Sequence, residues 1–314
     1  MGIAFVFPGQ GSQQLGMLSA LAAEFPIVSQ TFAEASAALG EDLWLLSQSG
    51  PEERLNQTEY TQPALLAAGV AVARVWTAAD GPAPTLLAGH SLGEYTALVI
   101  AGAIDFADAV RLTRLRGQLM QAAVPPGEGA MAAVLNAEPE VVEAVCAEAS
   151  AVAPVQPANL NSPGQIVISG AAAGVARATE LFKARGVKRV LPLAVSVPSH
   201  SSLMRGAADQ LATALEAVTV RAPTIPVIHN VDAAAHDSAE AVRRVLAEQL
   251  YRPVRWIEGV QALASRGATT LLECGPGKVL CGLVKRIDPT LSCHAIGEPA
   301  GLREALAATT GAAA

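Results

Sequence analysis

Leu86-Leu87-Ala88-Gly89-His90-Ser91-Leu92-Gly93-Glu94 is the stretch that decides the fold of this chain. An apolar run leads into a turn of small residues, and a helical pattern follows over residues 95–101. Gly89-x-Ser91-x-Gly93 matches the nucleophile-elbow pattern, in which a tight strand-to-helix turn exposes a serine hydroxyl. We therefore predict Ser91 at the N-terminus of a helix, with the backbone N–H of Leu92 facing a developing oxyanion.

Composition limits the classes of protein to which the chain can belong. Its 314 residues suffice for one large α/β domain or a domain with an insertion, and 51% of them are hydrophobic. The net charge of −7 and a pI near 5.3 argue against nucleic-acid binding. No apolar stretch is long enough to span a bilayer, and the N-terminus lacks the basic region of a signal peptide. We expect a cytoplasmic protein.

The four cysteines give no sign of a metal or redox motif. None forms a C-x-x-C pair, and no histidine cluster accompanies them. We expect all four to be reduced and structural. They are Cys146, Cys274, Cys281 and Cys293.

A glycine-rich turn, residues 8–14, follows a predicted first strand at residues 3–7. Gln14 occupies the position where a dinucleotide-binding loop would need its third glycine. Glycines in a turn also let a backbone N–H approach a substrate atom closely, and Gln10 is placed to supply one.

Residues 17–80 are predicted to be helical, with a polar loop at 56–63 before an apolar helix at 64–76. A further helix, residues 106–122, carries Arg111, Arg114 and Arg116. Most helical arginines face solvent, but one that turns toward a nucleophile would bind a carboxylate through two parallel hydrogen bonds.

Residues 128–196 follow a different pattern from their surroundings. Strands and helices are predicted there in the order β-α-β-β-α-β, which is the ferredoxin-like arrangement. We expect an α/β fold in which residues 1–127 and 197–314 form an α/β-hydrolase-like large subdomain and residues 128–196 an inserted small one. The cleft between them is a natural substrate site. After residue 200, strands are predicted at 224–229 and 269–273, helices at 239–250 and 254–265, and a terminal helix from 300.

A serine nucleophile needs a general base, and two histidines compete for that role. His200 and His229 each follow a predicted strand, where the site residues of open α/β sheets gather. Spacing favours His200 and leaves His229 as the alternative. No acid lies in a strand-end loop between Ser91 and His200, so we expect a Ser–His dyad whose imidazole is oriented by a neutral group.

Further motifs occur in order along nearly the whole chain. They are Phe7-Pro8-Gly9-Gln10-Gly11-Ser12-Gln13, Thr61-Gln62-Pro63-Ala64, the elbow itself, Arg116-Gly117, Met120-Gln121, Asn161-Ser162-Pro163-Gly164-Gln165, Val195-Ser196-Val197-Pro198-Ser199-His200, Gln249-Leu250-Tyr251 and Gly275-Pro276-Gly277-Lys278. With these motifs the chain closely resembles the malonyl-CoA:acyl carrier protein transacylases of type II fatty acid synthesis.

The resemblance implies catalytic roles. Ser91 would be acylated by malonyl-CoA. His200 would take its proton and later activate the phosphopantetheine thiol of the carrier protein. Gln249 would orient His200 through its backbone carbonyl, and the N–H groups of Gln10 and Leu92 would form the oxyanion hole.

It also implies substrate contacts and partners. Arg116 would bind the malonyl carboxylate, and Gln62 and Asn161 would line the cleft. No metal and no cofactor are implied, because malonyl-CoA is a substrate and the phosphopantetheine belongs to the holo acyl carrier protein. We expect a monomer that binds neither nucleic acid nor membrane.

An acidic carrier would need a basic patch on this acidic enzyme. Two sets of residues are candidates, namely Lys183, Arg185, Lys188 and Arg189, and Lys278, Lys285 and Arg286.

Three alternatives remain at this stage. One is a stand-alone acyltransferase of a polyketide pathway, and Val197-Pro198-Ser199 match neither usual pattern of the modular polyketide branch. The others are an acyl-thioester hydrolase and a non-catalytic carrier-binding module. The missing acid and Arg116 weigh against the hydrolase, and Ser91 with His200 against the binding module.

Overall fold

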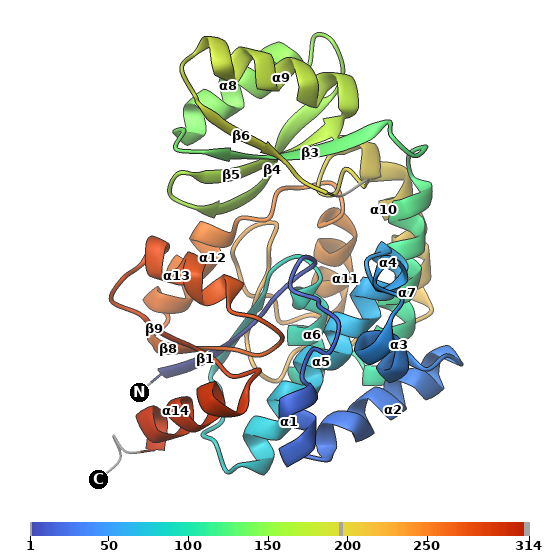
Figure 1. The fold of residues 1–314 in the computed structure, drawn as a ribbon, viewed down its shortest axis with the longest axis vertical. Helices are drawn as coiled ribbons and strands as arrows, with labels where there is room; N and C mark the ends of the chain where they lie inside the picture. The colour runs from blue at the N-terminus through green and yellow to red at the C-terminus, as the bar shows by residue number, and fades with distance from the viewer. Residues whose placement is uncertain (1, 195–196, 311–314) are drawn as a thin grey trace.

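Two sheets, one above the other along the long axis of the molecule, organise the fold (Figure 1). The computed structural model describes residues 2–194 and 197–310. Val195 and Ser196, part of the motif before His200, lie outside the described residues. Among the helices that are described, none combines the length and the apolar character needed to cross a membrane.

The first sheet is parallel and carries the elbow. Its strands, in spatial order, are β7 (Val227–Ile228), β2 (Leu86–Gly89), β1 (Gly2–Phe7), β8 (Ala268–Glu273) and β9 (Ser292–Ala295). All neighbours in it run parallel. Phe7 pairs with Gly89, so the carboxyl ends of β1 and β2 lie side by side and the turns that follow them meet. The register thereby brings Gln10 and Ser91 to one edge of the sheet.

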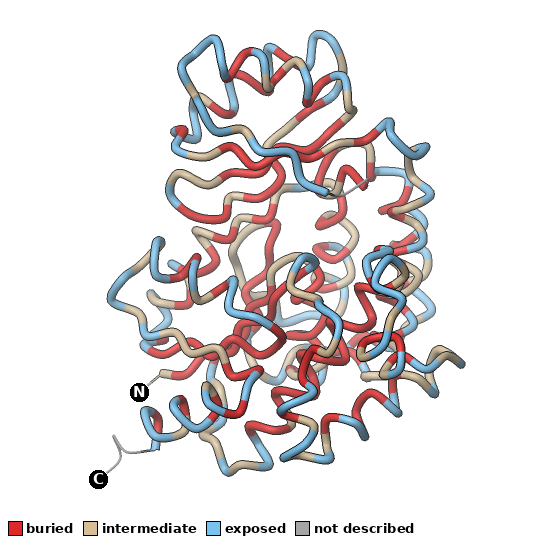
Figure 2. Tube along the Cα trace, viewed as in Figure 1, coloured by how far each residue is buried: buried red, intermediate tan, exposed pale blue. Residues whose placement is uncertain are grey.

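Helices cover both faces of this sheet, so that β7, β2, β1 and β8 are largely buried, whereas the edge strand β9 is partly exposed (Figure 2). The N-terminal set is α1 (Ser19–Glu24), α2 (Ile27–Leu39), α3 (Leu43–Ser49), α4 (Glu52–Leu55), α5 (Thr58–Ala78), α6 (Gly93–Ile100) and α7 (Phe106–Ala122). The C-terminal set is a 3₁₀ turn η1 (Ser202–Met204), α10 (Arg205–Glu216), α11 (Ala239–Glu248), α12 (Trp256–Ser265), α13 (Val279–Ile287) and α14 (Pro299–Thr310).

The second sheet is antiparallel, in the order β4 (Val155–Ser162), β5 (Gln165–Ala171), β3 (Gly129–Leu135), β6 (Arg189–Pro192). Helices α8 (Pro139–Ala149) and α9 (Ala172–Ala184) cover the face that points away from the parallel sheet (Figure 1). This order is the ferredoxin-like one, and the predicted fold class is confirmed.

Three local expectations are wrong. The polar stretch 58–63 is the start of α5 and not a loop, because packing of α5 against neighbouring helices buries Thr61 and Gln62 and outweighs the helix-breaking tendency of Pro63. Neither α13 nor β9 was expected. Finally, Cys281 and Cys293, which lie on those two elements, form a disulfide, whereas Cys146 and Cys274 are free and buried.

Candidate active site

Ser91 sits on a strained turn that only small neighbours permit. Its φ is +50°, in the left-handed region that residues other than glycine rarely adopt. A Cβ atom at Gly89 would lie 1.9 Å from the backbone of Gly93, and one at Gly93 would lie 2.0 Å from the carbonyl oxygen of Phe7. The two glycines are therefore required by close backbone approach, and the strand–turn–helix context of the elbow is present.

Asn230, which lies just beyond β7, holds the elbow from the end of the neighbouring strand. Its Oδ1 accepts a hydrogen bond from the N–H of Ser91 at 2.7 Å, and its Nδ2 donates to the carbonyl of Gly89 at 2.7 Å. One buried amide thus spans the turn and satisfies two backbone groups that the strained conformation leaves without regular partners.

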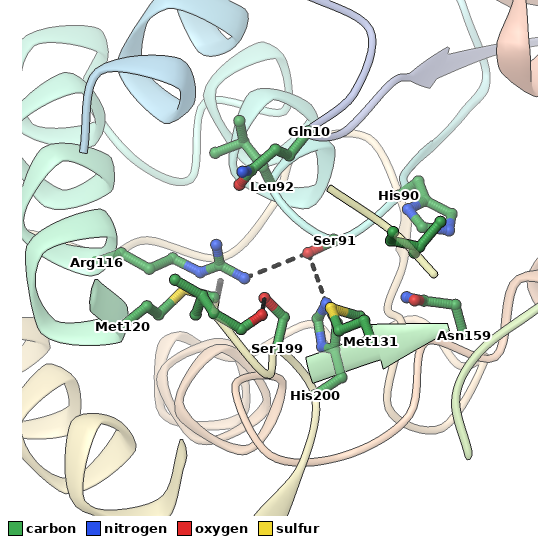
Figure 3. A pocket seen from close by; sticks show the side chains of 12 residues that line it. Gln10, His90, Ser91, Leu92, Arg116, Met120, Met131, Asn159, Ser199 and His200 are labelled. Carbon is green, nitrogen blue, oxygen red and sulfur yellow. Dashed lines mark hydrogen bonds between the residues drawn. The ribbon is translucent and has the colours of Figure 1, made fainter. Parts of the chain in front are cut away.

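His200 is the histidine that reaches the serine. Its Nε2 lies 2.8 Å from Oγ of Ser91, and its Nδ1 lies 2.7 Å from the backbone carbonyl of Gln249 (Figure 3 shows the first contact). A carbonyl only accepts hydrogen bonds, so Nδ1 carries the proton and the lone pair of Nε2 is free to accept the serine proton. Gln249 is the C-cap of α11, where carbonyls lack helical partners.

The surroundings keep the imidazole neutral. Burial lowers the pKa of His200, and the positive charge of Arg116 lowers it further, to about 3. At neutral pH the ring is therefore in the form that accepts a proton.

Arg116 projects from α7 to the nucleophile and is fully buried. Its Nη2 lies 3.3 Å from Oγ of Ser91, on a different side from His200 (Figure 3). Two side-chain amide oxygens hold the guanidinium, Oε1 of Gln62 at 2.9 Å from Nη1 and Oε1 of Gln249 at 2.9 Å from Nη2. Burial lowers the pKa of Arg116 from its ordinary value.

The charge on Arg116 has no anionic partner at contact distance. Within residues 2–194 and 197–310, the hydrogen bonds of its guanidinium go to neutral oxygens only, and its Nε is buried without a partner. The chemistry of such a group, a buried cation with neutral partners and an unpaired N–H, suits a carboxylate ligand.

Two backbone N–H groups of residues that line the space around Ser91 have no hydrogen-bond partner among the described residues. Gln10 and Leu92 both line the cavity above Ser91 (Figure 3). Neither N–H donates a hydrogen bond to any residue that the structure describes. Free donors beside a nucleophile are what an oxyanion hole requires.

The cavity around Ser91 measures about 120 Å³. Met120, Met131, Asn159, Leu193, Val197 and Ser199 line it together with His90 and the residues above. Gln62 and Asn161, expected to line the cleft, lie one layer behind it: Gln62 holds Arg116, and Oδ1 of Asn161 lies 2.8 Å from Nε2 of His90. Both amide side chains therefore position residues that line the cavity.

His229 lies away from the serine. It is buried with Nδ1 2.7 Å from Oε1 of Glu94. Asp105 and Asp108, two acids that follow the elbow in the sequence, pair with Arg221 and Arg111 at the surface. No cluster of three or more His, Cys, Asp or Glu side chains suited to a metal ion occurs in the described part of the chain.

Sequence reasoning missed several positioning residues. Besides Asn230 and Glu94, it missed Gln156, whose Nε2 donates to the backbone carbonyls of His200 and Tyr251 at 3.1 and 3.2 Å. Asn230 comes two residues after the end of β7 in the parallel sheet, and that position was the available signal. No such signal was available for Gln156, because its strand, β4, belongs to the antiparallel sheet.

Comparison with known proteins decides the family. The model of the acyl transferase domain matches residues 4–291. The malonyl CoA-acyl carrier protein transacylase of Escherichia coli K12 is 56% identical over 303 residues, which are 96% of this chain and 98% of that protein. The chain belongs to the malonyl-CoA:acyl carrier protein transacylase family. It is an acyltransferase.

Solved structures agree with this assignment. A transacylase of the same name from Xanthomonas oryzae is 60% identical, with a TM-score of 0.97 over 98% of this chain and 99% of that one. A malonyl-transacylase solved in complex with a type II polyketide acyl-carrier protein is 56% identical, with a TM-score of 0.96 over 98% and 99% of the two chains. The enzyme is thus similar both to a transacylase of the expected name and to a malonyl-transacylase that was solved with a polyketide acyl-carrier protein.

Proposed function

We propose that the enzyme moves the malonyl group of malonyl-CoA to the phosphopantetheine thiol of an acyl carrier protein through a malonyl-Ser91 intermediate. The observation that carries the proposal is the position of Oγ of Ser91, 2.8 Å from the base His200 and 3.3 Å from the buried cation Arg116. A nucleophile beside a carboxylate-binding group suits an acyl group with an anionic end.

The first half-reaction loads the serine. Oγ attacks the thioester carbonyl while Nε2 of His200 takes the hydroxyl proton. The carbonyl oxygen becomes an oxyanion that the N–H groups of Gln10 and Leu92 stabilise, an effect of about 3–4 kcal/mol per donor. The C–S bond then breaks, and the imidazolium returns its proton to the departing CoA thiolate.

The second half-reaction repeats these steps with the carrier. His200 takes the proton of the phosphopantetheine thiol, and the sulfur attacks the ester carbonyl of malonyl-Ser91. The ester C–O bond breaks, and Oγ regains the proton from the imidazolium. The carbonyl of Gln249 accepts from Nδ1 throughout and supports the positive ring, which is the role an acid has in Ser-His-Asp enzymes.

Arg116 selects the acyl group. The malonyl carboxylate lies one methylene beyond the acyl carbon, which brings it close to a guanidinium already near Oγ. An acetyl group leaves the same cation buried without an anion, and a site built for a polar group rejects a substrate that lacks it. Gln62 and Gln249 support the proposal because they hold both Nη atoms.

We further propose that the transferred malonyl group supplies fatty acid chain elongation in the cytoplasm. The alternative is a stand-alone transferase of polyketide synthesis, favoured by the relative solved with a polyketide carrier protein. The proposal also includes two subdomains, a large one of residues 1–127 and 197–314 and a small one of residues 128–196. It further includes a monomeric state and a reaction without a cofactor.

The carrier would dock near the small sheet. Arg189 and Arg286, from the two basic sets, line one cavity of about 410 Å³ together with Gln165. Arg286 donates to Oε1 of Gln165 at 2.9 Å, and Arg185 is paired with Glu148. Arg189 and Arg286 are therefore the residues of the two sets that we expect to meet an acidic carrier.

Intact-protein mass spectrometry tests the function directly. The enzyme is mixed briefly with malonyl-CoA, acetyl-CoA or methylmalonyl-CoA, and holo carrier protein is then added. A malonyl adduct at Ser91 that moves to the carrier is the expected result. An adduct released as free malonate would favour the hydrolase, and no adduct at all would favour the binding module. Holo carriers of fatty acid and polyketide type distinguish the two pathways.

A further inference from the structure

Glu94 is a buried acid that the proposed reaction does not use. It lies on the first turn of α6, three residues after the nucleophile, and its exposed fraction is 0%. Three groups surround its carboxyl oxygens: Nδ1 of His229 at 2.7 Å, the N–H of Asn230 at 2.9 Å and Nε2 of Gln249 at 2.9 Å. An acid is costly to bury, so its retention here calls for a role.

The contact with Gln249 fixes which way that amide points. Nε2 donates both to Oε2 of Glu94 and to the backbone carbonyl of Ser91, at 2.9 and 3.0 Å. Both partners are acceptors, so the NH₂ group must face them and Oε1 must face the other side. Oε1 there accepts from Nη2 of Arg116. The orientation of the amide therefore decides whether Arg116 meets an acceptor or a donor.

The contact with Asn230 reaches the nucleophile by a second route. Glu94 accepts from the backbone N–H of the residue whose side chain spans Ser91 and Gly89. The carboxyl group of Glu94 thus anchors both Asn230, which spans the elbow, and Gln249, which accepts from Arg116.

From this arrangement we infer that Glu94 is a positioning residue that sets the preference of the enzyme for an acyl group with a carboxylate. It does so by holding the Gln249 amide in the one orientation that presents Oε1 to Arg116. The inference rests on the malonyl transfer proposed above. The contact of Glu94 with Asn230 affects the position of Ser91, and hence the rate with every acyl donor alike.

Glu94→Gln tests the inference, because it keeps the size of the side chain and introduces a donor. A neutral amide at position 94 attracts Nε2 of Gln249 less strongly than a carboxylate does, so Oε1 of Gln249 is held less firmly toward Nη2 of Arg116. We expect the ratio of malonyl to acetyl loading, measured as kcat/KM by quench-flow and mass spectrometry, to fall about tenfold or more, as the loss of a hydrogen bond to a charged group implies. The apparent KM should rise for malonyl-CoA only, and kcat should fall for both donors.

Glu273→Gln is the matched control. Glu273 is also 0% exposed, but its carboxylate accepts from the backbone N–H groups of Leu280 and Cys281 at the start of α13. This variant should lower the melting temperature and leave the loading ratio unchanged. An unchanged ratio in Glu94→Gln as well would mean a merely structural role and would overturn the inference. Should Glu94→Gln not fold, Glu94→Asp takes its place, since a shorter acid draws back from Gln249, and the same ratio decides.

A double-mutant cycle shows whether Glu94 acts through Gln249. Gln249→Met removes the amide and keeps the backbone carbonyl that binds His200. We expect Glu94→Gln to lower the ratio in the wild-type background and to have no further effect on it in Gln249→Met. Equal effects in both backgrounds would contradict the inference. A wild-type enzyme that fails to load malonyl would instead contradict the proposed function, so the two failures are distinguishable.

Discussion

Nη2 of Arg116 lies 3.3 Å from Oγ of Ser91, so the charge proposed to recognise the substrate is next to the atom that attacks it. The same charge acts on His200, where it lowers the pKa of the base. Recognition and proton transfer are therefore electrostatically linked in this site.

Arg116→Ala should separate malonyl from acetyl transfer. We expect kcat/KM for malonyl loading to fall about 100-fold or more, because truncating one partner of a buried charge pair costs about 2–5 kcal/mol. Acetyl loading should be spared or rise. The control is Arg114→Ala on the same helix, whose side chain pairs with Glu41 and Glu59. Equal losses for both donors in Arg116→Ala would assign the arginine a structural role.

The pH dependence of acetyl loading should report the link between Arg116 and His200. The base acts when neutral, and its lowered pKa keeps wild-type loading active well below pH 6.5. Removing the positive charge in Arg116→Ala raises that pKa, so more of the ring is protonated at acid pH and the acid limb moves to higher pH. Burial remains, so the limb should stay below that of a free histidine. A limb that does not move would show that the charge is screened.

Asn230→Ala should weaken both the fold and the nucleophile. It removes two hydrogen bonds to the buried backbone of the elbow, at a cost of about 2–4 kcal/mol in the free energy of unfolding. Denaturant unfolding measures that cost. The rate of loading should fall by about the same factor for malonyl-CoA and for acetyl-CoA. The prediction fails if selectivity changes while stability does not.

Charge reversal at Arg189 or Arg286 should affect the carrier and spare the first half-reaction. We expect Arg189→Glu and Arg286→Glu to raise the apparent KM for holo carrier protein about tenfold, because each replaces a positive charge that attracts the acidic carrier with a negative one that repels it. Arg177→Glu on α9, whose side chain pairs with Glu180, provides a control. An unchanged KM in both variants would remove this surface as the docking site.

The elbow was predictable because its chemistry is local. Gly89, Ser91 and Gly93 lie within five residues, and steric clash alone dictates the glycines. Spacing favoured His200 as the base but left His229 open, since distance along the chain does not say which of two strand-end residues meets the serine.

The residues behind the cavity were the least predictable part of the site. Glu94 lies more than 130 residues before Asn230 and Gln249 in the sequence, and it acts on them through buried hydrogen bonds, which leave no periodic pattern. The disulfide was missed for a related reason: Cys281 and Cys293 meet only because α13 and β9, which were not predicted, lie side by side.

The division of the site between two kinds of support has an evolutionary consequence. The nucleophile follows β2 directly and its base lies on the turn before η1, whereas Gln62 and Arg116 project from α5 and α7. If Arg116 has the role proposed above, an exchange at these helix positions would change the acyl group that the enzyme accepts and leave the nucleophile and its base in place. We therefore expect new acyl specificities of this fold to arise at these helix residues rather than at the elbow.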